Sequence, residues 1–275
     1  MNAAWDRTFP DCTNGAAGRS KATKLKWGLS ALATLPWAQD IGPTADPTAL
    51  KAALNNAKQT LVVLDLPAGM APPSDLPPNS WTVARHTRQS ALSAENDPIE
   101  AWPSTRRKQY RRAEREGMTV HPCSDLTLMV ELHQAARIRK GLTSDEQALK
   151  RLLKELLRET DTHAWTVQDA QGEVLAGGVF HGANDGRCIY GFGGQFRSER
   201  PGDSSRATVL LIGHAMRHAA QMGAHTFDFG GSMDQGVDRF YAEFGAPIKT
   251  KHRLVRMSPI WRPLFRWRRP DLFAT

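Results

Sequence analysis

The most constraining feature of the sequence is a run of three short strand patterns in its second half. They cover 164–168, 173–181 and 187–193, separated by Asp-Ala-Gln-Gly and Asn-Asp-Gly. Glycine, asparagine and aspartate tolerate the positive φ angles of tight turns, so both separators predict hairpin connections. The sequence therefore predicts an antiparallel sheet on which the remaining elements must pack.

Helical patterns lie on both sides of these strands. Leucines recur at the spacing of an amphipathic helix from Leu149 to Leu157, and Ser144 with Gln147 forms a capping box ahead of them. Another apolar helix face begins after Ser124. The segments after the strands predict, in order, a helix, a strand, a helix and a strand: 204–222, 225–229, 237–244 and 248–257. The second half therefore predicts a mostly antiparallel sheet with a helix-connected parallel pair of strands.

The first half of the chain gives weaker patterns. Residues 1–23 are small and polar, and we expect a flexible segment there. A helix over 47–59 and a buried strand over 60–66 precede a proline-rich connection, and another strand covers 81–88. A helix over 104–116 carries a cluster of arginines and is predicted to link two halves. The length of 275 residues leaves room for two domains.

Two separated stretches together resemble a known family. One reads Phe-Asp-Phe-Gly-Gly-Ser over 227–232 and continues as Gly-Val-Asp-Arg-Phe-Tyr-Ala-Glu-Phe-Gly over 236–245; the other is the basic helix over 106–117. In this order they resemble the FemAB-like branch of the GNAT acyltransferase superfamily. The resemblance implies an α/β fold of the α+β type with two GNAT-like halves, each a mixed, mostly antiparallel sheet flanked by helices.

The resemblance also implies a division of the chain and an activity. We expect a degenerate GNAT-like half over 24–117 and an acyltransferase half over 118–257, between the flexible segment over 1–23 and a basic aromatic tail over 258–275. The implied enzyme is an N-acyltransferase that moves an acyl group from acyl-CoA to an amine of a small molecule or cell-envelope precursor, such as an amino sugar or a peptide. The alternative donor is aminoacyl-tRNA, as in peptidoglycan-type aminoacyl transferases.

Two departures from the family pattern bear on the donor. The usual pyrophosphate loop before the long helix is replaced by Arg-Pro-Gly-Asp-Ser-Ser-Arg over 200–206. The position that is usually lysine in the second motif is Tyr241. In tRNA-using members that lysine is thought to stabilise charge at the transferred carbonyl, so Tyr241 favours acyl-CoA as the co-substrate.

Acyl transfer to an amine needs groups that hold the carbonyl, accept a proton and donate one. The catalytic candidates are Asp228, Ser232 and Tyr241. Asp228 ends a strand and can act as a base or orient the amine, although a carboxylate before Gly-Gly also commonly fixes a loop by accepting backbone amides. Tyr241 can act as an acid toward a thiolate, since an ordinary phenol has a pKa near ~10. Its alternative role is that of a packed tyrosine.

Further residues are predicted to bind the donor and the acceptor. The start of the long helix offers free amides to donor phosphates. The donor-binding candidates are Gly202, Ser204, Ser205, Arg206 and Gly193. The substrate-binding candidates are Tyr190, His181, Gly230, Gly231, Arg239 and Arg111. His214 and His218 stand four residues apart without a third ligand, so we expect no metal.

The net charge of +8 is concentrated in two places. Residues 244–275 carry eight cations against one acid, and 106–115 carry six against one. The tail over 258–275 mixes tryptophans with arginines, which fits contact with an anionic membrane. It fits RNA such as tRNA less well, by stacking and phosphate contact, and it also fits an arm packed on its own domain. The alternative to an enzyme is therefore a non-catalytic module that binds a membrane or nucleic acid.

The remaining composition suggests a compartment. No apolar run reaches the ~18 residues of a spanning helix, and no leader pattern opens the sequence. Three widely spaced cysteines give neither a disulfide framework nor a metal pair. We therefore expect a cytoplasmic protein, with the tail offering peripheral contact at the inner face of the membrane.

Overall fold

The computed structural model describes residues 3–15, 18–38, 47–139, 141–142, 145–183, 185–231 and 234–273. Contacts divide the chain into two compact units: unit 1 is Met1–Ala4 with Arg88–Pro247, and unit 2 is Trp5–Thr87 with Ile248–Thr275. The predicted boundary after residue 117 therefore differs from the observed one. The reason is that α3 (Ser104–Arg115) packs on α6 (Asp203–Gln221) and so belongs to unit 1.

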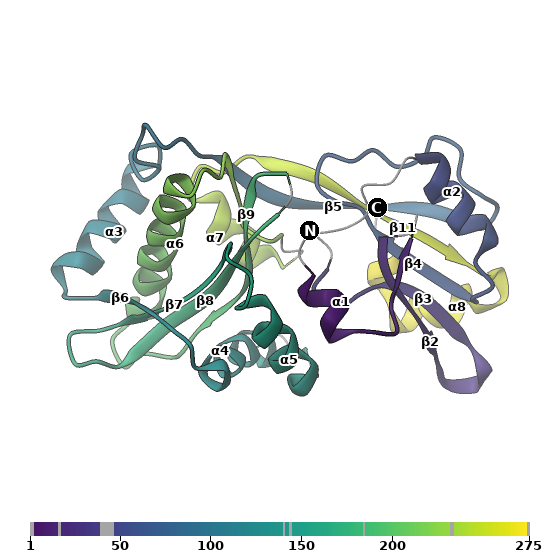
Figure 1. Ribbon diagram of the computed structural model, residues 1–275, viewed down its shortest axis with the longest axis horizontal. Helices are drawn as coiled ribbons and strands as arrows, with labels where there is room; N and C mark the ends of the chain where they lie inside the picture. The colour runs from purple at the N-terminus through teal and green to yellow at the C-terminus, as the bar shows by residue number, and fades with distance from the viewer. Residues whose placement is uncertain are drawn as a thin grey trace. The chain divides into compact units, whose positions relative to one another are not determined.

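Unit 1 contains a mixed, mostly antiparallel sheet with the strand order β5-β10-β9-β8-β7-β6 (Figure 1). Its strands are the end of β5 (Ser80–Ala91), β6 (Thr119–Pro122), β7 (Thr162–Gln168), β8 (Val174–Gly182), β9 (Arg187–Gln195) and β10 (Thr226–Asp228). Both predicted hairpins, β7–β8 and β8–β9, are confirmed. β10 lies parallel to β9 because α6 carries the chain back across the sheet.

Some helices of unit 1 begin at an aspartate side-chain cap, whereas α3 and α6 have no side-chain cap. The helices of this unit are α3, α4 (Leu126–Ile138), α5 (Glu146–Leu156), α6 and α7 (Gln235–Ala242). The predicted leucine stripe on α5 is confirmed as buried. Its cap is Asp145, whose carboxylate accepts a hydrogen bond from the backbone of Ala148, rather than the predicted Ser144, which lies outside the described residues.

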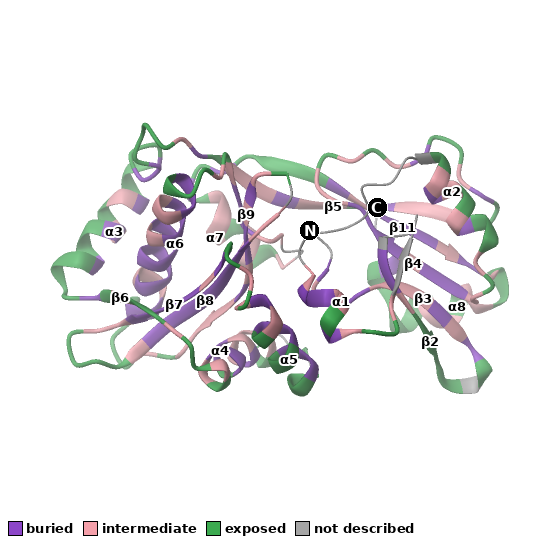
Figure 2. Cartoon of the chain, in the orientation of Figure 1, coloured by how far each residue is buried: buried purple, intermediate pink, exposed green. Residues whose placement is uncertain are grey.

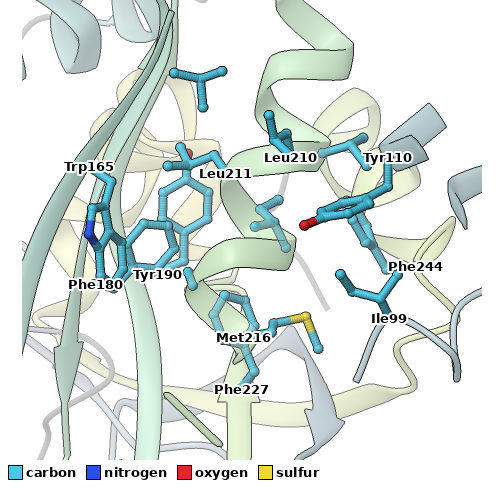
Figure 3. Close-up of a cluster of buried hydrophobic side chains, with 14 of the residues drawn as sticks. Ile99, Tyr110, Trp165, Phe180, Tyr190, Leu210, Leu211, Met216, Phe227 and Phe244 are labelled. Atoms are coloured by element: carbon cyan, nitrogen blue, oxygen red, sulfur yellow. The ribbon is translucent and has the colours of Figure 1, made fainter. Parts of the chain in front are cut away.

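The core of unit 1 is aromatic on two sides of α6. Figure 3 shows α6 side chains between rings from the sheet and a second group from α3, from the loop before α3 and from the segment just after α7. The sheet contributes Trp165, Phe180, Tyr190 and Phe227, and the second group is Ile99, Tyr110 and Phe244. Each such side chain contributes about 1.5–3 kcal/mol when fully buried. This packing holds α6 and β9 in a fixed relation.

Unit 2 contains a second sheet with the strand order β1-β2-β3-β4-β11-β5. Its strands are β1 (Thr13–Gly15), β2 (Gly18–Lys24), β3 (Ser30–Thr34), β4 (Leu61–Asp65), β11 (Ile248–Met257) and the first part of β5. The helical segments are α1 (Ala4–Thr8), η1 (Lys26–Gly28), α2 (Pro47–Asn56), η2 (Pro259–Trp261), α8 (Arg262–Arg268) and η3 (Pro270–Leu272). Leucines of α2 pack on one face of β4, and Leu272 packs in a separate cluster with Leu61 and Met257.

The expectation of an unstructured segment over 1–23 is wrong for secondary structure. Trp5 is buried, and its indole donates a hydrogen bond to the carbonyl of Pro36 at 3.1 Å. Arg19 on β2 is buried and pairs with Asp6 at 2.9 Å. These contacts override a weak local pattern, because strand formation depends on the neighbouring surface more than on the residues themselves.

Within the described ranges, no helix is both long enough and apolar enough to cross a bilayer.

Candidate functional site

A cavity of about 440 Å³ lies in unit 1. Its walls come from the C-terminal half of α4, the glycine-rich end of β9, the first turns of α6, the loop after β10, and α7. α4, α6 and β10 each contact β9. Because the helices pack on a common sheet, side chains from widely separated sequence positions meet here.

Two tyrosines face this cavity. Tyr190 on β9 and Tyr241 on α7 both line it, with ring centroids 6.4 Å apart, and Phe229 lies 5.0 Å from the Tyr241 ring. Burial raises the pKa of both phenols well above the ordinary value, so both stay protonated at neutral pH. Among the described residues, neither hydroxyl has a hydrogen-bond partner. The two phenols can therefore donate hydrogen bonds to a ligand.

Glycines allow the backbone and these rings to come close. A Cβ atom on Gly193 would overlap the Tyr190 hydroxyl, and one on Gly194 would overlap the carbonyl of Leu132 on α4. Gly230 has a φ of 78°, and a Cβ there would overlap the Tyr190 carbonyl. Gly193, Gly230 and Gly231, all predicted site residues, line the cavity. The backbone at these positions is thus directly accessible to a bound group.

Asp228 does not line the cavity. It is fully buried, and its carboxylate accepts hydrogen bonds from Gln89 at 2.8 Å, from Arg187 at 2.9 Å and from the backbone of Gly230 at 2.9 Å. The structure therefore gives it the loop-fixing role that was the alternative to a base. The prediction failed because its two side-chain partners lie 139 and 41 residues away in sequence.

The start of α6 differs from the predicted phosphate site. Gly202 is the N-cap, and Ser204 donates a hydrogen bond to the carbonyl of Phe196 at 2.6 Å. Arg206 pairs with Glu116 at 2.9 Å and also with Asp203, so its charge is already neutralised. The Asp203 carboxylate occupies the helix end that attracts anions. Of the donor-binding candidates at this helix start, Ser205 lines the cavity.

The other predicted residues lie elsewhere. His181 is buried outside the cavity, within 3.3 Å of the carbonyl of Gly182, and burial lowers its pKa. Arg239 is exposed on α7, and Arg111 is exposed on α3, where it pairs with Glu100 at 3.2 Å. Neither arginine lines the cavity. Ser232 lies outside the described residues.

The sequence reading missed the contribution of α4. Arg137 and Arg139 both line the cavity, and Arg139 donates a hydrogen bond to the carbonyl of Gln195 at 2.9 Å. No carboxylate stands among the described lining residues, so the cavity carries net positive charge. The sequence could have indicated these two arginines, because both follow directly after the apolar face of a predicted helix.

His133 on α4 also lines the cavity. Both of its ring nitrogens are buried and lack a hydrogen-bond partner in the described part of the chain. Burial, assisted by the nearby Arg137 charge, lowers its pKa to about 4. The imidazole is therefore neutral at physiological pH.

The described residues contain no group of three or more histidine, cysteine, aspartate or glutamate side chains that could hold a metal ion. His214 and His218 instead pack edge-on against Trp165, with ring centroids 4.9 and 5.1 Å away.

Comparison with known families assigns the chain. Residues 104–241, just over half of it, match the model of the acetyltransferase (GNAT) domain family. The chain belongs to the GNAT family. The match includes the basic helix over 106–117 and the other stretch as far as residue 241, whereas residues 242–245 of that stretch lie beyond it. No curated protein matches the sequence.

Solved structures support the same GNAT-type fold. FemX superposes with a TM-score of 0.62 at 16% identity, covering 90% of this chain and 86% of FemX. L-PGS from Bacillus licheniformis superposes with a TM-score of 0.60 at 14% identity, covering 100% of this chain and 98% of that protein. The chain is thus a member of the GNAT family, and its fold is similar to those of FemX and L-PGS.

Proposed function

We propose that the unit 1 cavity transfers an acyl group from acyl-CoA to an amine of a small molecule or cell-envelope precursor, such as an amino sugar or a peptide. The observation that carries the proposal is the pair of protonated phenols of Tyr190 and Tyr241 beside the Gly230–Gly231 backbone, neither of which has a hydrogen-bond partner among the described residues. Acyl transfer develops negative charge on the carbonyl oxygen, and donors fixed around that oxygen stabilise it.

The reaction follows from these groups. The neutral amine forms a bond from its nitrogen to the thioester carbon, and the C–S bond then breaks with its electron pair on sulfur. The proton lost by nitrogen balances the proton gained by the thiolate. A phenol whose pKa is raised well above that of a thiol is a poor proton donor to the thiolate. Tyr241 is therefore assigned to hydrogen bonding at the carbonyl oxygen rather than to the acid role expected from the sequence.

The positive charge of the cavity supports an anionic donor. Arg137 and Arg139 line the cavity at the C-terminal end of α4, and the Arg206 charge is engaged by Asp203 and Glu116. We therefore assign donor phosphates to Arg137 and Arg139 instead of Gly202–Arg206. Guanidinium groups suit phosphate oxygens because they offer planar, charged donors.

One observation favours aminoacyl-tRNA as the second candidate donor. The start of α6, which holds the pyrophosphate in typical members of the family, is occupied here by Asp203 and its ion pair. Because Asp203 occupies this helix end, a donor such as aminoacyl-tRNA, which need not place a pyrophosphate there, is also compatible with the site. The two donors differ in salt dependence, because binding of tRNA weakens steeply with added salt through counterion release.

The first experiment is calorimetric titration of the full chain with CoA, acetyl-CoA, a long-chain acyl-CoA and charged tRNA at two salt concentrations. Saturable CoA binding that changes little with salt supports the proposal. Binding of tRNA alone, steeply salt-dependent, favours the second donor.

The Tyr241→Phe substitution tests the chemistry once a donor and an amine are found. Removal of one oxyanion donor lowers kcat by roughly 100-fold or more with little change in KM. Tyr110→Phe is the matched control, since Tyr110 accepts a hydrogen bond from Arg217 and lies outside the cavity. Full turnover in Tyr241→Phe would contradict the assignment, and full biological function without turnover would favour the non-catalytic module.

A further inference from the structure

A surface of unit 2 joins two segments that are far apart in sequence. Leu25, Lys26 and Leu29, around η1, line the same hollow of about 190 Å³ as Leu264, Phe265 and Arg268 of α8. The basic tail seen in the sequence is therefore one side of a larger surface. We call this surface, formed by residues 24–26 and 260–268, the η1–α8 face.

Large apolar side chains protrude from the η1–α8 face. Ile260 is 77% exposed, Trp267 is 76% exposed and Leu25 is 36% exposed. Figure 2 shows the turn between β2 and β3, which carries Leu25, as exposed. Other aromatic residues of the tail behave differently, since Phe265 and Phe273 pack against the unit 2 core. Isolated exposed apolar residues are ordinary, but several beside one hollow indicate an interaction site.

Cations surround these apolar side chains. Lys24, Lys26, Arg266 and Arg268 are exposed, and the Arg268 guanidinium lies over the Trp267 ring, 5.5 Å from its centroid. The carboxylate of the described tail, Asp271, is engaged by Arg269 at 2.8 Å and by Arg253 at 3.3 Å. The face thus combines positive charge with protruding Leu, Ile and Trp side chains, and the exposed carboxylate of Asp271 after α8 is already engaged by Arg253 and Arg269.

We propose that the η1–α8 face binds the surface of an anionic lipid bilayer. The cations contact phosphate headgroups, Trp267 lies at headgroup depth, and Ile260 and Leu25 enter the boundary of the acyl chains. Two of the three protruding side chains are aliphatic and cannot stack on bases, so a nucleic acid would leave them exposed. Charge and side-chain type together therefore select a membrane as the partner. This proposal concerns unit 2 and is independent of the acyl-transfer proposal for unit 1.

The test is co-sedimentation of the full chain with vesicles of phosphatidylcholine alone and of phosphatidylcholine with phosphatidylglycerol. We expect binding to the anionic vesicles, weakened by salt and absent on phosphatidylcholine. Lys26→Gln with Arg266→Gln is expected to weaken the partition about 25-fold, since each surface cation contributes about fivefold. Ile260→Ser with Trp267→Ser is expected to abolish the blue shift of tryptophan fluorescence on binding.

Matched controls come from exposed residues of unit 1. Met222 is 64% exposed and Arg239 is exposed, so Met222→Ser and Arg239→Gln repeat the same chemical changes away from this face. Equal binding to both vesicle types, or undiminished binding by both double variants, would overturn the proposal. The proposal would also be overturned if the chain bound no vesicles but bound tRNA, and if these substitutions weakened the tRNA binding. Thermal unfolding of each variant separates loss of contact from loss of fold. Turnover of soluble substrates is expected to stay unchanged in both double variants, which distinguishes this result from a failure of the site in unit 1.

Discussion

Two basic helices, α3 and α8, look alike in sequence but differ in what surrounds their arginines. On α3, Arg106 is only 2% exposed, pairs with Glu243 at 2.8 Å and lies 4.2 Å from the Phe240 ring centroid. On α8, Arg266 and Arg268 are exposed and lie over aromatic rings. The acids that engage α3 are Glu100 before the helix, Glu116 at its C-cap and Glu243 at the C-cap of α7. A run of positive charge therefore indicates a ligand only where the fold supplies no carboxylates.

The largest expected effect tests whether α3 is structural. Arg106→Met removes the ion pair, the hydrogen bond to the carbonyl of Phe240 and the contact with two aromatic rings. We expect the free energy of unfolding, measured by urea titration, to fall by about 3 kcal/mol.

Arg107→Met is the matched control on the same helix. Arg107 is partly exposed and pairs with an exposed glutamate, so its loss is expected to cost less than about 1 kcal/mol. Equal losses in the two variants would remove the distinction between buried and exposed arginines on α3.

A second prediction contrasts Arg106 with His133, which responds to burial by losing its proton. The pKa of His133 is lowered to about 4 in the folded chain, against ~6.5 when unfolded. Between these values the unfolded state binds more protons, so stability is complete above pH ~6.5 and is lost as pH falls toward ~4. The loss from this residue is on the order of 2–3 kcal/mol. Thermal or urea unfolding across this pH range measures it.

His133→Leu is expected to flatten this acid dependence without abolishing it. Burial also lowers the pKa values of His163, His181, His214 and His218, and each adds loss of the same sign. His121→Leu, at an exposed position on β6, serves as the control. An unchanged pH slope in His133→Leu would show that this imidazole is hydrated rather than buried.

The smallest expected effect compares a paired arginine with one on the cavity wall. Arg139→Gln is expected to weaken CoA binding about tenfold, because a charge-assisted hydrogen bond contributes about 1.5–3 kcal/mol. Arg206→Gln is expected to leave the Kd unchanged, since its charge is used by Asp203 and Glu116. Arg111→Gln, at an exposed position of α3, is the control for the change in net charge. Calorimetry in one buffer measures the Kd for CoA of each variant. A larger loss of affinity in Arg206→Gln than in Arg139→Gln would show that the donor phosphates bind at the start of α6.

The sequence predicted those features of the fold and site that depend on local patterns, and it failed where distant segments supply the partner. The β7–β8–β9 hairpins and the α5 leucines depend on local turn residues and periodicity, and both were predicted. Tyr190 and Tyr241 were predicted from family motifs and chemistry, and the structure brings them together. Asp228 and Arg206 were misjudged because their partners, Arg187 and Glu116, are brought to them only by the fold. No local pattern marked α1, β2 or the boundary at Thr87, which depend on tertiary contacts.

The glycines of β9 have a consequence for anyone who redesigns the cavity. Gly193 and Gly194 leave no volume for even a methyl group, because the Tyr190 hydroxyl and the Leu132 carbonyl already occupy it. Substitutions on α4 and α7, whose side chains also line the cavity, can therefore alter the range of substrates, whereas substitutions of Gly193 or Gly194 can hardly do so. In a saturation library, substitutions at Gly193 and Gly194 are expected to be lost, whereas cavity-lining positions of α4 and α7 other than Tyr241 are expected to accept change.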